Sequence, residues 1–150
     1  MTAGQTFHWF DPIATRREMS HILRAGGQAA LIWNTREVTG SPFQAVYEDL
    51  LLRFGTDFKK VDHQRNFPAD KLAAFFAPNA MSRTSFRHEQ IFDLAGLQGR
   101  LLASSYAPTP QDAHYLPMLD ALRQIFDRFE RNGAVHFRLL TEVYHEEMTQ

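Results

Sequence analysis

The spacing of hydrophobic residues in this chain predicts where its helices lie. Apolar side chains recur at steps of three and four in four stretches, which predicts helices over 12–25, 42–54, 94–102 and 111–131. A shorter helix is predicted over 70–76, and the residues before it, 55–68, show no regular period. Residues at the ends of these predicted helices also indicate where the helices begin and stop. Asp11-Pro12 and Ser41-Pro42 each place a capping side chain before a proline, while Gly26-Gly27 and Asn132-Gly133 are stop signals.

Other stretches have the spacing of strands. Apolar and polar residues alternate over 83–89 and again over 135–144, which predicts two strands, the first of them half-exposed. Residues 28–34 are apolar on both faces, a pattern typical of a strand buried inside a parallel sheet. The polar stretch 35–41 then predicts a loop at the carboxyl end of that strand.

The first residues of the chain have the pattern of a strand end, a loop and a helix cap. Such a strand needs neighbouring strands, so the segment 2–12 suggests the middle of an α/β domain. The order of elements is strand end, helix, strand, helices, strand, helix, strand. We therefore predict an α/β fold with few strands, and one domain over residues 1–150.

Composition excludes several classes of protein. Hydrophobic residues make up 44% of the chain, including 13 Phe, which is ample material for a core. Basic and acidic residues are nearly balanced, 16 against 17, so no nucleic-acid partner is expected. Cysteine is absent, which rules out disulfides and thiolate sites. With no signal pattern and no membrane-length apolar run, we expect a cytoplasmic protein without a membrane partner.

The seven histidines do not form a recognisable metal motif. His88-Glu89 lacks the second histidine of the zinc motif H-E-x-x-H, and His145 is followed by two glutamates near the end of the sequence. Scattered surface histidines explain this distribution better, so no metal site is predicted. No G-x-S-x-G nucleophile elbow occurs, and no catalytic residue is assigned.

Three segments resemble one protein family. Gln5-Thr6-Phe7-His8-Trp9-Phe10-Asp11 resembles the Q-A-F-H-W-F-D segment of class I S-adenosylmethionine-dependent methyltransferases of the small-molecule type. Ile22-Leu23-Arg24-Ala25-Gly26-Gly27 is similar to the family's V-L-R-P-G-G, followed by Leu31-Ile32-Trp33-Asn34. The stretch from Gly99 to Tyr106 is similar to the S-x-S-Y region. The resemblance runs in order through nearly the whole chain.

The resemblance covers only the carboxyl-terminal half of that family. It implies a partial doubly wound, Rossmann-like sheet that lacks the first strands and the glycine-rich turn that holds the cofactor. Gly26-Gly27 lies between a helix and a strand, the wrong side of a helix for that turn, and no G-x-G-x-G occurs. Because ligands in open α/β sheets bind where the strand order reverses, this chain would supply one wall of the crevice. We expect it to bind S-adenosylmethionine weakly or not at all when isolated.

The resemblance also assigns cofactor contacts. It places Gln5, His8 and Trp9 in the loop beside the reactive end of the cofactor. The alternative interpretation is that Trp9 and Phe10 are core residues and that His8 is an ordinary loop histidine.

Three further residues are candidate substrate contacts. Asn34 at the end of the buried strand would line the substrate side, although an ordinary turn residue explains it equally well. The resemblance also implies that Ser105 and Tyr106, together with Ser104, hydrogen-bond the substrate, and the alternative is a helix end packed by Tyr106.

Three functions follow from these expectations. The first is a truncated methyltransferase, inactive alone, that transfers a methyl group to a small molecule together with a complementary amino-terminal half. The second is a non-catalytic descendant of a methyltransferase that self-associates, and the third is a module binding another small ligand. An open sheet edge and uncovered apolar helix faces predict a homodimer or a complementary partner chain.

Overall fold

The computed structural model of the chain describes residues 1–56, 58 and 69–148. Most of the stretch predicted to be irregular, 55–68, lies outside these residues. The chain divides into two compact units. Unit 1 comprises 1–35, 62–87 and 140–150, and unit 2 comprises 36–61 and 88–139. The expectation of one domain stays a prediction.

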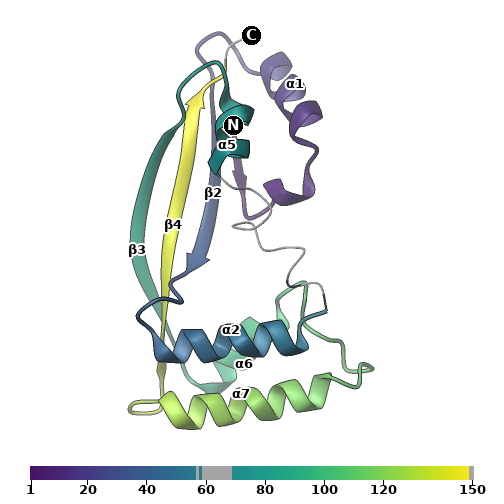
Figure 1. The fold of residues 1–150 in the computed structure, drawn as a ribbon, viewed down its shortest axis with the longest axis vertical. Coiled ribbons are helices and arrows are strands. Elements are labelled where there is room, and N and C mark those ends of the chain that lie inside the picture. The colour runs from purple at the N-terminus through teal and green to yellow at the C-terminus, as the bar shows by residue number, and fades with distance from the viewer. Residues whose placement is uncertain (57, 59–68, 149–150) are drawn as a thin grey trace. The chain divides into compact units, whose positions relative to one another are not determined.

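The elements alternate between helices and strands, as the spacing predicts (Figure 1). The strands are β1 (Thr2–Gly4), β2 (Gln28–Arg36), β3 (Ser82–Phe92) and β4 (Val135–Glu147), in the sheet order β1-β2-β4-β3. The helices are η1 (Phe7–Trp9), α1 (Pro12–Ile22), α2 (Pro42–Phe54), α5 (Ala69–Phe76), α6 (Leu94–Leu102) and α7 (Tyr115–Phe129). None of these helices is long and apolar enough to cross a membrane.

Unit 1 begins with the predicted strand, helix and strand. β1 pairs in parallel with β2, with Thr2 opposite Ala30. Asp11 caps α1, because its carboxylate accepts a hydrogen bond from the backbone N–H of Ala14 at 2.7 Å. The helix ends at Ile22, before the predicted glycine stop, and the chain turns at Gly26, whose φ of 76° favours glycine. The predicted parallel unit is confirmed.

The prediction of a strand enclosed in a parallel sheet is wrong for the other side of β2. The Met148 N–H donates to the Gly27 carbonyl, and the Glu37 N–H donates to the Arg138 carbonyl. As residue numbers rise along β2, those opposite them on β4 fall, so these two strands are antiparallel (Figure 1). β2 also continues to Arg36, into the stretch predicted to be a loop.

The core of unit 1 lies around β2. Alternate residues of β2 are buried, and those between them are partly or fully exposed, so the strand has one buried face rather than two. Phe7 is fully buried, and its ring meets that of Phe75 at 4.7 Å. The buried cluster consists of Ala3, Phe7, Met19, Ala29, Leu31, Trp33, Leu72, Phe75, Phe76 and Met148.

The core of unit 2 lies between α2, α6, α7 and one end of β4. Ser41 caps α2 as predicted, and the helix buries its apolar stripe against α7. The stripe consists of Phe43, Val46, Tyr47, Leu50, Leu51 and Phe54, with only Val46 partly exposed. α7 starts four residues later than predicted, because Asp112 accepts a hydrogen bond from the His114 N–H in a preceding turn.

β3 departs from its predicted exposure. Every residue from Ser82 to Ile91 is exposed, whereas the alternation predicted one buried face. Phe86 and Ile91 are 57% and 61% exposed. β3 is the last strand in the sheet order and pairs only with β4. Alternation indicated the strand correctly, but burial depends on what packs against each face.

Candidate functional site

The candidate site in unit 1 lies at the carboxyl ends of the two parallel strands. Gln5 follows β1 directly, and its backbone N–H donates to the Ile32 carbonyl at 2.9 Å. Its side-chain amide donates to the Asn34 carbonyl at 3.2 Å. The structure therefore brings together Gln5 and Asn34, two residues that the sequence indicated separately.

The backbone of this corner is constrained. Gln5 has a φ of 54°, a left-handed conformation that is uncommon for a residue other than glycine. Asn34 belongs to β2, and its side-chain oxygen accepts from the Thr141 hydroxyl at 2.6 Å. The alternative interpretation of Asn34 as an ordinary turn residue is wrong, because the residue lies within β2. Left-handed residues of this kind concentrate at functional sites, which makes the corner a candidate for one.

η1 places His8 and Trp9 next to this corner. Phe7 anchors the short helix in the core, while Trp9 is 63% exposed and Phe10 is 43% exposed. The rings of His8 and Trp9 lie 4.9 Å apart. The alternative that Trp9 and Phe10 are core residues is wrong, because the buried anchor is Phe7 instead.

His8 has an unusual environment for a loop histidine. Its Nδ1 is buried and has no hydrogen-bond partner among the residues that the structure describes. Burial lowers the pKa of His8 below its ordinary value of 6.5, so the imidazole is neutral at pH 7. A neutral imidazole beside an exposed indole offers uncharged aromatic groups to a ligand.

These side chains fit one side of S-adenosylmethionine. An indole face attracts cations, and the cofactor carries a sulfonium, while the orphaned Nδ1 of His8 has hydrogen-bonding capacity to spare. The cofactor also has ribose hydroxyls and a methionine group, which acidic side chains and backbone amides hold in such sheets. No G-x-G-x-G turn occurs in the sequence. These side chains therefore fit only one side of the cofactor.

Unit 1 also holds a buried polar network that the sequence did not single out. Glu142 is 6% exposed, and its carboxylate accepts hydrogen bonds from the Thr35 hydroxyl at 3.0 Å and the Tyr144 hydroxyl at 2.9 Å. Arg83 donates to the same carboxylate at 2.6 Å. Burial alone would raise the pKa of Glu142, but the hydrogen bonds from Tyr144, Arg83 and Thr35 hold it below its ordinary value.

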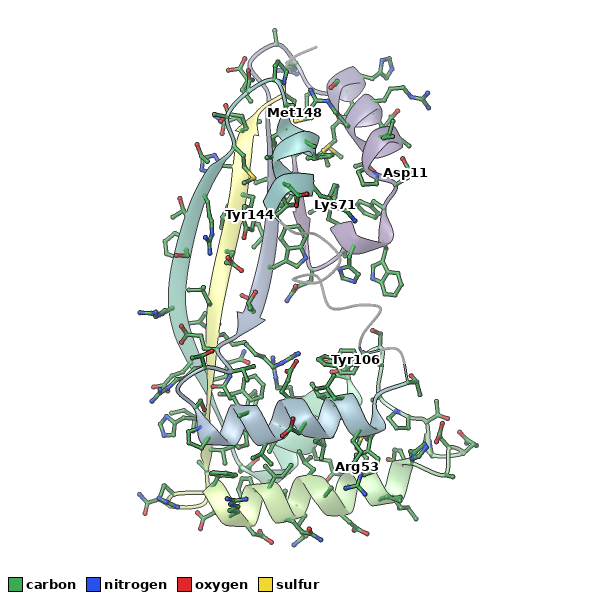
Figure 2. The ribbon with its side chains drawn as sticks, in the orientation of Figure 1. Asp11, Arg53, Lys71, Tyr106, Tyr144 and Met148 are labelled. Atoms are coloured by element: carbon green, nitrogen blue, oxygen red, sulfur yellow. The ribbon has the colours of Figure 1, made fainter. Side chains whose placement is uncertain are left out.

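Simple alternation does not predict this network, because the buried positions of β4 change from odd-numbered to even-numbered residues along the strand. Odd-numbered residues of β4, from Val135 to Leu139, are buried in unit 2, whereas the even-numbered Glu142 is buried in unit 1. Simple alternation counts Glu142 among the exposed positions. Figure 2 shows Tyr144 and Met148 on the unit 1 part of the chain. A glutamate on the polar side of a strand gives no sequence signal of burial.

Ser105 and Tyr106 belong to unit 2, and Asn34 belongs to unit 1. Ser105 is exposed in a turn. Tyr106 packs its ring on Phe58 at 5.0 Å, and its hydroxyl accepts from Arg36 at 3.4 Å (Figure 2). Tyr106 therefore has a packing role, as the alternative interpretation expects, and its hydroxyl is also hydrogen-bonded. The described residues contain no group of three or more side chains suited to a metal ion.

The fold resembles that of methyltransferases, with a mixed four-stranded sheet whose strands are separated by helices along the chain. A solved structure from Anaeromyxobacter dehalogenans, assigned as a type II methyltransferase, matches 99% of the chain with a TM-score of 0.57. The two sequences are 16% identical, and the match covers 63% of that protein. It therefore supports the fold alone.

Sequence comparisons lead to the same class. An uncharacterized methyltransferase of Schizosaccharomyces pombe is 25% identical over 98% of this chain, which spans 58% of that relative's length. An uncharacterized methyltransferase of Mycobacterium tuberculosis is 46% identical over 34 residues, or 23% of this chain and 14% of the relative. No protein-family model matches the chain. The chain is methyltransferase-like and spans little more than half the length of its fission-yeast relative.

Proposed function

We propose that this chain forms the carboxyl-terminal part of a methyltransferase that acts on a small molecule. The observation that supports the proposal is the hydrogen bond between Gln5 and Asn34 at the carboxyl ends of the parallel strands β1 and β2. Trp9, which follows Gln5 closely in the chain, is exposed. Ligands of open α/β sheets bind at such strand ends. The corner would form one wall of an S-adenosylmethionine site.

An amino-terminal methyltransferase segment would supply the other wall and the glycine turn. Unit 1 offers a surface for it, because four large apolar side chains between residues 9 and 22 are exposed: Trp9, Phe10, Ile13 and Ile22. Ile13 is 82% exposed, and β1 stands at an edge of the sheet. Exposed apolar groups and open strand edges mark contact sites. A second copy of this chain is the competing occupant.

Catalysis in the completed enzyme would rest on positioning. Bound S-adenosylmethionine would supply a sulfonium whose methyl group bonds to the acceptor's nucleophilic atom, while S-adenosylhomocysteine leaves and the acceptor's proton passes to solvent. The contribution of this chain would be to hold the two reactants in line and to exclude water. Neutral His8 and exposed Trp9 would shape the cofactor side.

Calorimetry with S-adenosylhomocysteine tests the proposal in two steps. The 150-residue chain alone is expected to bind more weakly than about 1 mM. Co-expression with a class I methyltransferase amino-terminal segment that carries the glycine turn is expected to give a complex with affinity near 10 μM, a gain of roughly a hundredfold. Micromolar binding by the chain alone would contradict the need for a second wall.

Two variants locate the cofactor in that complex. Trp9→Ala is expected to weaken binding about tenfold, as loss of a cation–aromatic contact would do. Leu116→Ala is the matched control, because Leu116 is a similarly exposed apolar residue, at 69%, on α7. Equal affinity of the two variants would remove Trp9 from the cofactor site. A chain that forms only homodimers and gains no affinity would favour the non-catalytic alternative.

A further inference from the structure

The helices α2 and α7 enclose a groove with a cavity volume of about 330 Å³. One face of α2 lines it between Val46 and Phe54, and one face of α7 lines it between Ala121 and Arg128. All of the lining residues belong to unit 2, so the groove lies within one compact unit. Pockets for small molecules have volumes of roughly 300–1,000 Å³, and this groove is therefore of a size that suits a small ligand.

The two helices run antiparallel along this groove. Phe43, near the start of α2, meets Phe129 at the end of α7, with the ring centres 6.0 Å apart. Phe54, at the end of α2, meets His114 just before α7, at 6.1 Å. The carboxyl end of each helix therefore lies beside the amino end of the other, and residues late in α2 and late in α7 stand at opposite ends of the groove.

An arginine stands at each end of the groove, Arg53 on α2 and Arg128 on α7. The Arg53 guanidinium lies 4.8 Å from the centre of the Phe54 ring, and Phe54 itself lines the groove. Figure 2 shows Arg53 between the two helices. The Arg128 guanidinium lies 5.0 Å from the centre of the Phe129 ring, which is not part of the lining. Arg53 is therefore the arginine whose guanidinium is held against a wall of the groove.

The lining of the groove has a surplus positive charge. It holds two arginines, Arg53 and Arg128, and one carboxylate, Asp49, so two positive charges face one negative charge. Neither arginine forms an ion pair with a carboxylate among the residues that the structure describes. A guanidinium binds a carboxylate through two parallel N–H···O bonds. An anion with a single charge would therefore balance the lining.

The floor of the groove is apolar. Leu50, Phe54 and Ile125 line it, although they are core residues that are only 4%, 7% and 8% exposed. The groove therefore reaches down to the core of unit 2. Along α2, Arg53 and Val46 are about two helical turns, or roughly 10 Å, apart. An unbranched aliphatic chain of medium length would cover this floor, with a charged group at the Arg53 end.

We propose that the groove between α2 and α7 binds a small aliphatic carboxylic acid, with the carboxylate at Arg53 and the chain over Leu50 and Ile125. Burial of the chain would supply most of the affinity, and the guanidinium would select the charged head. A carboxylate matches the surplus charge better than a phosphate, whose second negative charge would be repelled by Asp49. This site does not depend on the proposed function, because it lies wholly in unit 2.

NMR titration of the full isotope-labelled chain tests the site, with octanoate as the probe. Octanoate is expected to bind with an affinity of roughly 1 mM and to shift amide resonances of α2 and α7. Octanamide, its neutral isostere, is expected to bind about fivefold more weakly or worse, because it lacks the charge. Butyrate is expected to bind about tenfold more weakly, because it buries fewer methylene groups. Equal affinities for octanoate and octanamide, or shifts confined to residues outside α2 and α7, would overturn the proposal.

Substitutions locate the carboxylate. Arg53→Gln is expected to weaken octanoate binding about tenfold and to leave octanamide binding unchanged. Arg123→Gln is the matched control, because Arg123 is an exposed arginine of α7 outside the lining, and its affinity for octanoate is expected to stay at the wild-type value. If Arg53→Gln keeps the preference for octanoate over octanamide, Arg53 has only a structural role and the proposal fails. A larger loss in Arg128→Gln than in Arg53→Gln would likewise contradict the placement of the carboxylate.

A substitution that fills the groove covers the case in which Arg53→Gln does not fold. Ala121→Leu places a larger aliphatic side chain where the chain of the acid would lie. It is expected to weaken octanoate binding about tenfold while the thermal unfolding midpoint stays the same or rises, because filling a cavity stabilises a fold. Unchanged affinity in this variant counts against the proposal. Size-exclusion chromatography tests a protein occupant: if the wild-type chain self-associates and Ala121→Leu does not, the groove is an interface with a second copy, and the proposal is overturned.

Discussion

Replacing Glu142 by glutamine tests whether the buried network stabilises unit 1. The Glu142 side chain is 7% exposed, and its carboxylate accepts three side-chain hydrogen bonds, from Thr35, Arg83 and Tyr144. Glutamine keeps the shape and removes the charge, and its amide group can only donate where the second carboxylate oxygen accepted.

The magnitude follows from the exposure of each partner. Hydrogen bonds to a buried charged group contribute about 1.5–3 kcal/mol each, and a neutral acceptor retains roughly half of that. The Arg83 side chain is 55% exposed, so solvent screening reduces its ion pair to less than about 1 kcal/mol. We expect Glu142→Gln to lower the free energy of unfolding by about 2 kcal/mol, a value set mainly by Thr35 and Tyr144.

The assay is urea unfolding at pH 7, with Glu89→Gln as the matched control. Glu89 pairs with His136 at 3.0 Å, but both side chains are about half exposed, at 48% and 52%. Its replacement is expected to change stability by less than about 0.5 kcal/mol. Similar values for the two variants would refute the reasoning that burial gives the Glu142 network its strength.

The pH dependence of stability gives a second measure of the network. The pKa of Glu142 is lowered in the folded state, so its contribution is present above the ordinary value of 4.5. It is lost as the pH falls through the folded-state pKa. The Glu142→Gln variant is expected to lack this acid-side component, and an unchanged pH profile between pH 3 and 6 would count against it.

Three further predictions concern the cores and the site. Leu51→Ala in α2 is expected to lower the free energy of unfolding by about 2–5 kcal/mol in urea unfolding, because Leu51 is 1% exposed. The control is Leu52→Ala, at a neighbour that is 36% exposed, and it is expected to cost under about 1 kcal/mol. Equal costs of the two substitutions would contradict the assigned apolar stripe. Asp11→Ala is expected to cost about 1 kcal/mol through loss of the α1 cap, with Asp11→Asn near wild type by the same measurement. Since burial lowers the pKa of His8, stability is expected to fall as the pH drops below 6.5 toward the folded-state pKa, and NMR titration of His8→Gln against wild type identifies the resonance responsible.

The candidate site could be predicted in part. The sequence indicated Gln5, Trp9 and Asn34 through a family resemblance, and the fold shows that Gln5 and Asn34 are hydrogen-bonded across adjacent strands. No sequence signal indicated that the carboxylate of Glu142 is buried and hydrogen-bonded to Thr35, Arg83 and Tyr144. Charge balance depends on which side chains meet after folding, and residues distant in sequence decide it.

Local signals determined most of the elements of this protein. Capping at Asp11 and Ser41, helical spacing in α2 and α7, and alternation in β4 depend on neighbouring residues, so they could be predicted without the fold.

Only the tertiary structure decided what lies against each face. It placed β4 antiparallel beside β2, left β3 exposed and buried Glu142 by a change of parity within one strand. The physical reason is that burial and pairing are properties of contacts between distant segments, whereas a strand's own alternation fixes only which residues share a face.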